Sequence, residues 1–135
     1  MRSAARDTLA GMVKLSFCLR RLPSLSREQF QAYWFGTHAP LVRKQAAALR
    51  IQRYVQTHTL IGDAADSLRA TRGGPEGYDG VAELWWKSEA DIAEAMASSA
   101  GAEAGRILLE DERKFIDLAN SPLFWARERE IIPGK

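Results

Sequence analysis

The sequence has little of several features that define common protein classes. It contains a single cysteine, Cys18, in 135 residues, which excludes an internal disulfide and a cluster of thiolates around a metal ion. No segment approaches the roughly 20 consecutive apolar residues of a membrane-spanning helix, and this excludes a helical membrane protein. The net charge is only +2, so nothing in the charge balance points to nucleic acid as a partner. We therefore expect a cytoplasmic protein.

Patterns that bind metals or nucleotides are also missing. The only two histidines, His38 and His58, have no second ligand at the spacing of zinc or iron sites. The Gly73-Gly74 pair lacks the strand, lysine and helix of a phosphate-binding loop. We expect no metal and no cofactor, although haem ligation by either histidine stays formally open.

What the chain does contain is enough apolar sequence for one domain. Hydrophobic residues make up 46% of the chain and charged residues 27%, the usual balance of a folded globular domain. Residues 1–11 lack the apolar segment of a secretory signal, and we expect them to be a flexible tail, with Met12 as an alternative start. The folded domain should span residues 12–132, and residues 133–135 should form a second tail.

The first half of the chain predicts a strand and then a helix. Apolar residues alternate with polar or small ones over residues 13–19, which is typical of a strand with two different faces. Ser26 and Gln29 have the spacing of a capping box, which begins a helix. Pro40 should kink or interrupt this helix before it resumes to about Leu49. Its predicted core face carries three aromatic residues, Phe30, Tyr33 and Trp34.

The middle of the chain predicts a strand and a long loop. Residues 51–60 are rich in strand formers and place Tyr54, Gln56 and His58 on one face. Residues 61–77 show little periodicity and predict a loop of the length often found in lids. Its two arginines, Arg69 and Arg72, are candidates for closing over an anionic group of a substrate.

The last part of the chain predicts a third strand, a second helix and a fourth strand. A third strand is expected over residues 78–86, and a helix capped by Ser88 should be interrupted near Gly101. A fourth strand over residues 115–118 and 123–132 should bend at its Asn-Ser-Pro sequence. The order βαββαβ predicts an α+β, ferredoxin-like fold in which both helices cover one face of a four-stranded antiparallel sheet. Nothing in the chain covers the other face, so a second copy is expected to cover it in a homodimer.

Several sequence blocks carry a resemblance to a known family. The blocks are Val13-Lys14-Leu15-Ser16-Phe17-Cys18-Leu19-Arg20-Arg21, Tyr33-Trp34 with Thr37-His38-Ala39-Pro40-Leu41-Val42, Arg53-Tyr54-Val55-Gln56, Tyr78-Asp79-Gly80-Val81-Ala82-Glu83-Leu84-Trp85 and Phe115-Ile116-Asp117. Together, from about residue 12 to 132, they resemble the EthD family. The resemblance implies a dimeric α+β barrel, formed by two ferredoxin-like sheets packed face to face. It also implies a cavity between the first helix and the sheet, but it says little about the reaction.

Three residues are candidates for acid–base chemistry. His38 lies at the interruption of the first helix, where imidazole can act as general acid or base, or where it can simply cap the helix or serve as a packing residue beside Pro40. Asp79 can orient a histidine or act as a base, or it can cap the turn before its strand. Tyr54 is the third candidate. A mid-strand carboxylate, Glu83, is expected to be structural and to pair with Arg53 or Arg20.

The expected cavity is apolar. Small residues at Gly80 and Ala82 should leave room opposite large ones. The predicted substrate-binding residues are Leu15, Phe17, Trp34, Gly80, Ala82 and His58, although His58 can equally be solvated or lie at the dimer interface. Cys18 should face the other side of the sheet as a small buried residue. That side, with Trp85 as its anchor, is the expected dimer face, and it carries Ser16, Cys18, Val81, Glu83 and Trp85.

Two classes of function follow. The first is a cofactor-free enzyme acting on a small apolar, aromatic or polyketide-like molecule in aromatic or xenobiotic catabolism, with His38 as general acid or base. The resemblance allows cyclase, dehydratase, isomerase or monooxygenase chemistry. The alternative is a non-catalytic ligand-binding or structural dimer that accompanies an oxygenase system.

Overall fold

An antiparallel sheet organises the described part of the chain, which the computed structural model gives as residues 11–62 and 66–134. The sheet consists of β1 (Val13–Leu19), β2 (Arg53–His58), β3 (Gly80–Trp86) and β4 (Leu123–Ala126), in the spatial order β2-β3-β1-β4. The four described strands pair antiparallel throughout. The tail predicted over residues 1–11 lies outside the described residues except for Gly11. The predicted α+β, ferredoxin-like fold is confirmed.

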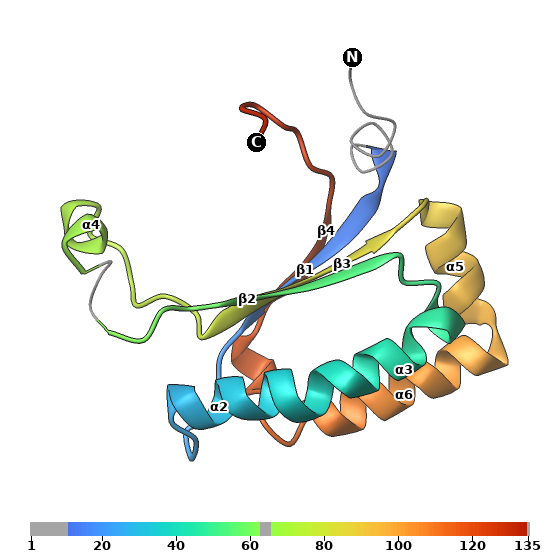
Figure 1. Cartoon of the computed structure of the whole chain (residues 1–135), viewed down its shortest axis with the longest axis horizontal. Coiled ribbons are helices and arrows are strands. Elements are labelled where there is room, and N and C mark those ends of the chain that lie inside the picture. The colour runs from blue at the N-terminus through green and yellow to red at the C-terminus, as the bar shows by residue number, and fades with distance from the viewer. Residues whose placement is uncertain (1–10, 63–65, 135) are drawn as a thin grey trace.

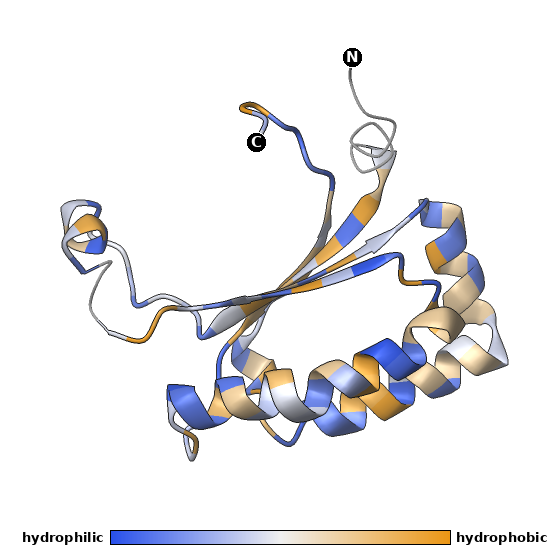
Figure 2. Ribbon diagram, in the orientation of Figure 1, coloured by the Kyte–Doolittle hydropathy of each residue, from blue (hydrophilic) through white to orange (hydrophobic). Residues whose placement is uncertain are grey.

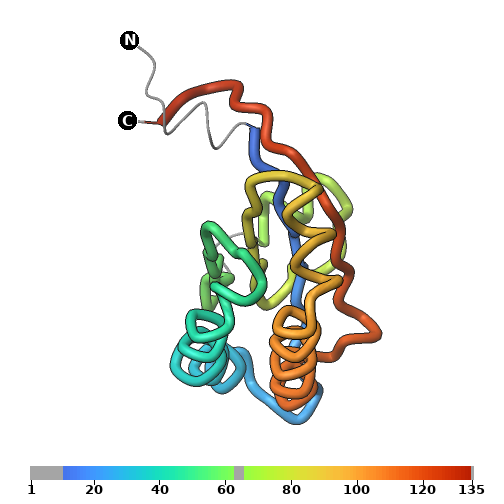
Figure 3. The backbone as a smooth tube through the Cα atoms, turned by 90° about the vertical axis from the view of Figure 1, so that its right-hand side faces the viewer, coloured from blue at the N-terminus to red at the C-terminus, as the bar shows by residue number. Residues whose placement is uncertain are grey.

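Helices cover one face of this sheet and leave the other bare (Figure 1). The covering layer contains α2 (Arg27–Tyr33), η1 (Trp34–His38), α3 (Ala39–Leu49), α5 (Glu89–Ala97) and α6 (Ser99–Glu112). Figure 3 shows α3 and α6 side by side beneath the strands. Within residues 11–62 and 66–134, no helix is long and apolar enough to cross a membrane.

The alternation of residue types along the strands decides which side chains face the helices (Figure 2). Leu15 pairs with Leu84 and Phe17 with Ala82 across β1 and β3, so all four point to the same side. The largest group of buried side chains forms there, between β1, β3 and the first helix. Its members are Phe17, Leu19, Phe30, Trp34, Ala82, Phe115 and Ile116.

Pro40 interrupts the α-helical hydrogen bonding of the first helix, as predicted, but the chain stays helical there through a π turn. In η1, a single π-helical turn, the N–H of Ala39 donates to the carbonyl oxygen of Trp34, five residues back. Pro40 has no N–H to donate, and in an α turn its ring would press on the carbonyl of Gly36. The wider π turn accommodates the ring. The helix therefore runs from α2 into α3 without a break (Figure 1).

The second helical segment breaks at Ser98 rather than at Gly101. Ser98 is extended, and its Oγ accepts a hydrogen bond from the N–H of Gly101, which begins α6. Gly101 is buried because α5 ends directly above it. A Cβ at this position would lie 1.9 Å from the carbonyl oxygen of Ala95.

Two further element predictions need correction. The loop predicted over residues 61–77 contains a short helix, α4 (Asp66–Thr71), on an arm that projects beyond the sheet (Figure 1). The fourth strand is limited to residues 123–126. Its predicted first part contributes a single bridge between Ile116 and Arg21, followed by the short 3-10 helix η2 (Leu118–Asn120).

The bare face of the sheet is covered in part by its own charged side chains. Within the chain Glu83 forms an ion pair with Lys14, in place of the expected Arg53 or Arg20. Lys14 and Arg53 instead lie over the ring of Trp85, and the indole N–H donates to Glu128 over 2.7 Å. Trp85 is therefore only 3% exposed within one chain, and it is not available as the anchor of a dimer.

Candidate active site

A cavity of about 190 Å³ lies between the inner face of the sheet and the helices. Strands β1 and β3 contribute Leu15, Phe17 and Ala82 to its wall, and the helices contribute apolar residues such as Trp34 and Leu108. Among the many apolar side chains, three lining residues can exchange a proton: His38, Tyr54 and Glu112. A few ionisable groups in an apolar cavity are typical of a small-molecule site.

His38 is held in the cavity wall by contacts from distant parts of the chain. It is 5% exposed and lies on the π turn, and its Nδ1 is 2.7 Å from Oδ2 of Asp111 on α6. The hydroxyl of Tyr33 donates to the other oxygen of Asp111 over 2.6 Å. The ring of Phe115 packs beside the imidazole, with 5.0 Å between centroids. His38 makes no side-chain capping bond, so the helix-cap alternative is wrong.

The surroundings set the protonation of this histidine–aspartate pair. Burial lowers the pKa of His38, and the hydrogen bond to Asp111 offsets this only in part. Burial alone would raise the pKa of Asp111, but the hydrogen bonds from Tyr33 and His38 hold it below its usual value. At neutral pH the pair is a neutral imidazole beside a carboxylate. Because the carboxylate only accepts, the ring proton lies on Nδ1, and Nε2 is left to accept a proton.

Glu112 is the second ionisable group of the cavity. Within the described residues its carboxyl group has neither a hydrogen bond nor an ion pair. Burial raises its pKa to about 7, and the neighbouring charge of Asp111 contributes to the rise. A carboxyl group with this pKa is part protonated at neutral pH, so it can donate a proton where His38 accepts one.

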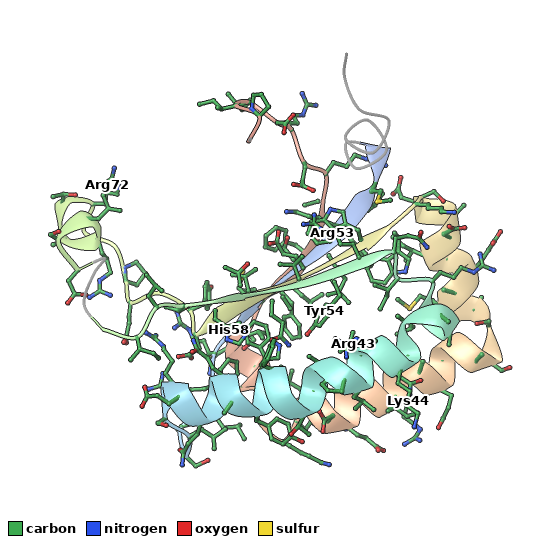
Figure 4. All side chains as sticks on the ribbon, viewed as in Figure 1. Arg43, Lys44, Arg53, Tyr54, His58 and Arg72 are labelled. Carbon is green, nitrogen blue, oxygen red and sulfur yellow. The ribbon has the colours of Figure 1, made fainter. Side chains whose placement is uncertain are left out.

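Tyr54 extends from β2 into the space between the sheet and α3 (Figure 4). Its hydroxyl oxygen accepts a hydrogen bond from the side-chain amide of Gln56 over 2.9 Å. Burial raises the pKa of Tyr54, and the nearby charge of Glu112 adds to the rise. The phenol therefore keeps its proton at neutral pH and can donate a hydrogen bond to a ligand.

The structure brings most of the predicted site residues to this one cavity. They are Leu15, Phe17, Trp34, His38, Tyr54 and Ala82. Gly80 and His58 do not line it. The six-membered ring of Trp34 packs directly on Gly80, where a Cβ would lie 2.4 Å from a ring carbon, so the glycine admits the indole instead of leaving space. His58 also stacks on Trp34, with 4.5 Å between centroids, and lines an open hollow outside the cavity.

Asp79 also lies outside the cavity. It is 3% exposed, and its carboxylate accepts hydrogen bonds from the backbone and side chain of Arg21 and from the side chain of Arg27. Burial would raise the pKa of Asp79, but these bonds hold it below its usual value. This arrangement joins the end of β1, the start of α2 and the start of β3, and it leaves no oxygen directed at the cavity.

Two residues of the site were not found from the sequence. Asp111 follows Leu108 at helical spacing and is buried like it, so a carboxylate in line with apolar residues of a helix was the available signal. Glu112 gave no signal, because it belongs to a run of charged residues at the end of a helix. In the described part of the chain, no group of three or more His, Cys, Asp and Glu side chains is placed to hold a metal ion.

Comparisons with known proteins agree with the fold. The EthD domain matches residues 22–119, whereas no curated protein matches the chain. An EthD family protein from Bacillus halodurans has 24% sequence identity and a TM-score of 0.57, over 87% of this chain and 99% of that one. A dimeric ferredoxin-like protein of unknown function from Thermobifida fusca has 11% identity and a TM-score of 0.56, over 87% and 91% of the two chains. SnoaB, a cofactor-independent oxygenase from Streptomyces nogalater, has 12% identity and a TM-score of 0.50, over 93% and 100%.

Proposed function

The chain belongs to the EthD family, and we propose that it is a cofactor-independent enzyme that transfers protons on a small apolar or aromatic molecule bound in its cavity. The observation that carries this proposal is the His38–Asp111 pair in the wall of an otherwise apolar space. A buried aspartate that fixes one nitrogen of a histidine leaves the other nitrogen oriented as a general base.

In this proposal each ionisable residue of the cavity has a separate role in proton transfer. Nε2 of His38 removes a proton from the bound molecule, and Asp111 stabilises the imidazolium that forms. Tyr33 holds Asp111 in place through its hydroxyl group. Glu112, with a pKa of about 7, or the phenol of Tyr54 supplies a proton to the oxygen at which negative charge develops.

Proton removal next to a carbonyl group is the first step shared by cyclisation, dehydration and isomerisation. Removal of a proton from an electron-rich ring also prepares it for direct reaction with oxygen. SnoaB, which shares the fold, is described as a cofactor-independent oxygenase, so we keep monooxygenase chemistry within the proposal.

The test is hydrogen–deuterium exchange at an acidic C–H bond, which needs no knowledge of the full reaction. A bicyclic aromatic ketone such as 2-tetralone is incubated with the protein in D₂O, and NMR follows the loss of its C1 hydrogens relative to buffer. We expect wild type to accelerate the exchange, and His38→Gln to slow it by about 10² to 10⁴ while the ketone still binds. Lys44→Gln, an exposed change on α3, should exchange like wild type.

Two results would overturn the catalytic role. Equal exchange by wild type and His38→Gln, with the ketone bound to both, would leave a ligand-binding protein, which is the alternative function. The same conclusion would follow if wild type bound the ketone but exchanged its C1 hydrogens no faster than buffer does.

We also propose that a second copy covers the bare face of the sheet. Phe124, opposite Ser16 on this face, is 52% exposed. The arm carrying α4 and the chain after β4 both extend on this side of the sheet (Figure 1), and they carry the exposed Leu60, Ile61, Ile131 and Ile132. The dimeric state of the Thermobifida fusca protein supports the proposal.

Light scattering tests this assembly. We expect the mass of two chains at micromolar concentration and the mass of one chain for Phe124→Glu. Leu109→Glu is the matched control, because Leu109 is also an exposed apolar residue but lies on the helical side. A wild-type mass of one chain would refute the dimer.

A further inference from the structure

An open groove runs beside the cavity, between the edge strand β2 and the first helix. It consists of two adjoining hollows of about 620 and 210 Å³ that share Ala39, Arg43 and Tyr54. We call it the β2 groove, and the residues that matter to its chemistry are Phe35, Ala39, Arg43, Tyr54, Gln56 and His58.

Tyr54 lies between the β2 groove and the cavity, because its side chain lines both. Val42 and Ile51 also line both the cavity and the smaller hollow. The groove and the cavity therefore adjoin at these side chains, and a ligand whose apolar part occupies the cavity would direct its other end toward the groove at Tyr54. The cavity alone is larger than the roughly 150 Å³ that holds a single benzene ring in an engineered protein, so one or two fused rings suit it.

The charged side chains that line the β2 groove are positive. Arg43 extends from α3 toward β2 (Figure 4) and is exposed. Among the described residues its guanidinium has neither an ion pair nor a hydrogen bond, and no carboxylate lines either hollow. Arg50, at the end of the same helix, by contrast has acidic partners in Asp91 and Glu94. An unpaired guanidinium at the edge of an apolar site favours an anion, and its planar fork matches a carboxylate.

We propose that Arg43 binds a carboxylate of the substrate at the mouth of the cavity and thereby selects aromatic carboxylates over neutral analogues. This inference rests on the proposed function for the placement of the aromatic part. It replaces the expectation that Arg69 and Arg72 close over an anion. Arg69 pairs with Asp66, and Arg72 lies on the arm, on the far side of the sheet from Tyr54 (Figure 4).

The experiment compares 2-naphthoate with its neutral analogue 2-naphthamide. Dissociation constants are measured by calorimetry for wild type, Arg43→Gln and Lys44→Gln. Lys44 is the matched control because it is the next cation on α3, is exposed, and points away from β2 (Figure 4).

We expect wild type and Lys44→Gln to bind 2-naphthoate about tenfold more tightly than 2-naphthamide, the effect of one charge-assisted contact. Arg43→Gln should lose this preference through weaker binding of 2-naphthoate, with its affinity for 2-naphthamide unchanged. Arg43→Lys should keep part of the preference.

The outcomes separate this inference from the proposed function. If Arg43→Gln retains the preference, or if wild type has none while 2-naphthamide binds, the role of Arg43 is refuted and the cavity remains the binding site. If neither compound binds wild type, the role of Arg43 is refuted, and the deuterium exchange of 2-tetralone decides the proposed function by itself.

Discussion

Gly105 offers the sharpest test of the cavity, because two effects of one substitution should have opposite signs. It lies in the middle of α6 and lines the cavity together with Leu108 and Glu112. A Cβ at this position would meet no atom of the surrounding protein within 4 Å. Glycine weakens a helix interior by about 1 kcal/mol relative to alanine. The helix thus contains a destabilising glycine at a position where a larger side chain would fill part of the cavity.

We expect Gly105→Leu to raise the free energy of unfolding and to abolish the binding of 2-naphthamide. Helix propensity contributes about 1 kcal/mol, and each methylene that becomes buried adds up to about 0.8 kcal/mol. A total of about 1 to 3 kcal/mol raises the Tm by roughly 3 to 10 °C for a domain of this size. Gly105→Ala should give the propensity gain alone and retain most of the binding.

The same helix provides the control. Gly101→Ala brings a Cβ to 1.9 Å from the carbonyl oxygen of Ala95 and 2.9 Å from Oγ of Ser98, so it should lower the free energy of unfolding. Urea and thermal unfolding give the stability of each variant, and calorimetry gives its affinity. A Gly105→Leu variant that is less stable than wild type, or that binds 2-naphthamide normally, would refute the cavity as described.

Three further changes test the ionisable groups. The raised pKa of Glu112, about 7 against 4.5, means that its contribution to stability is present below about pH 4.5 and lost as the pH rises through 7. Glu112→Gln should therefore raise the free energy of unfolding by about 1 to 3 kcal/mol at about pH 8 and leave it unchanged at about pH 4; equal effects at both values would contradict the raised pKa. Asp79→Asn should lower the free energy of unfolding by about 3 kcal/mol, because Arg21 and Arg27 lose their buried anion. The affinity for 2-naphthamide should not change, and weaker binding would connect Asp79 to the site. Asp111→Asn should slow deuterium exchange of 2-tetralone at least tenfold and preserve its binding, whereas unchanged exchange would exclude Asp111 as the positioning residue.

Local patterns in the sequence were enough to predict the first three strands and the start of the first helix. The alternation over residues 13–19 gave β1 and the face on which Leu15 and Phe17 lie, because successive side chains of a strand point to opposite sides. The capping box also formed as predicted, with Ser26 and Gln29 bonded to each other's backbone N–H. These features depend on neighbours within a few residues, and short-range geometry decides them.

Features that depend on how two elements pack were mispredicted or missed. The sequence placed an interruption before Pro40, but it did not reveal that a π turn would keep the chain helical through it. Gly80 was expected to leave open space in the cavity. The alternation of the strand places this glycine on the inner face, but it does not show which side chain packs against it, and in the structure that side chain is Trp34.

The candidate site itself was decided by tertiary structure. The sequence singled out His38 as an ionisable residue beside the expected cavity, and its catalytic role stays a prediction. Its partner Asp111 lies 73 positions away on α6, and only the packing of α6 beside the first helix brings the two together. The same packing turns Glu112 from one member of a charged run into a buried carboxyl group, since the pKa of a group is set by the atoms that surround it. The sequence by itself thus determined most of the elements and their inner faces, whereas the tertiary structure decided which charges meet and which space stays empty.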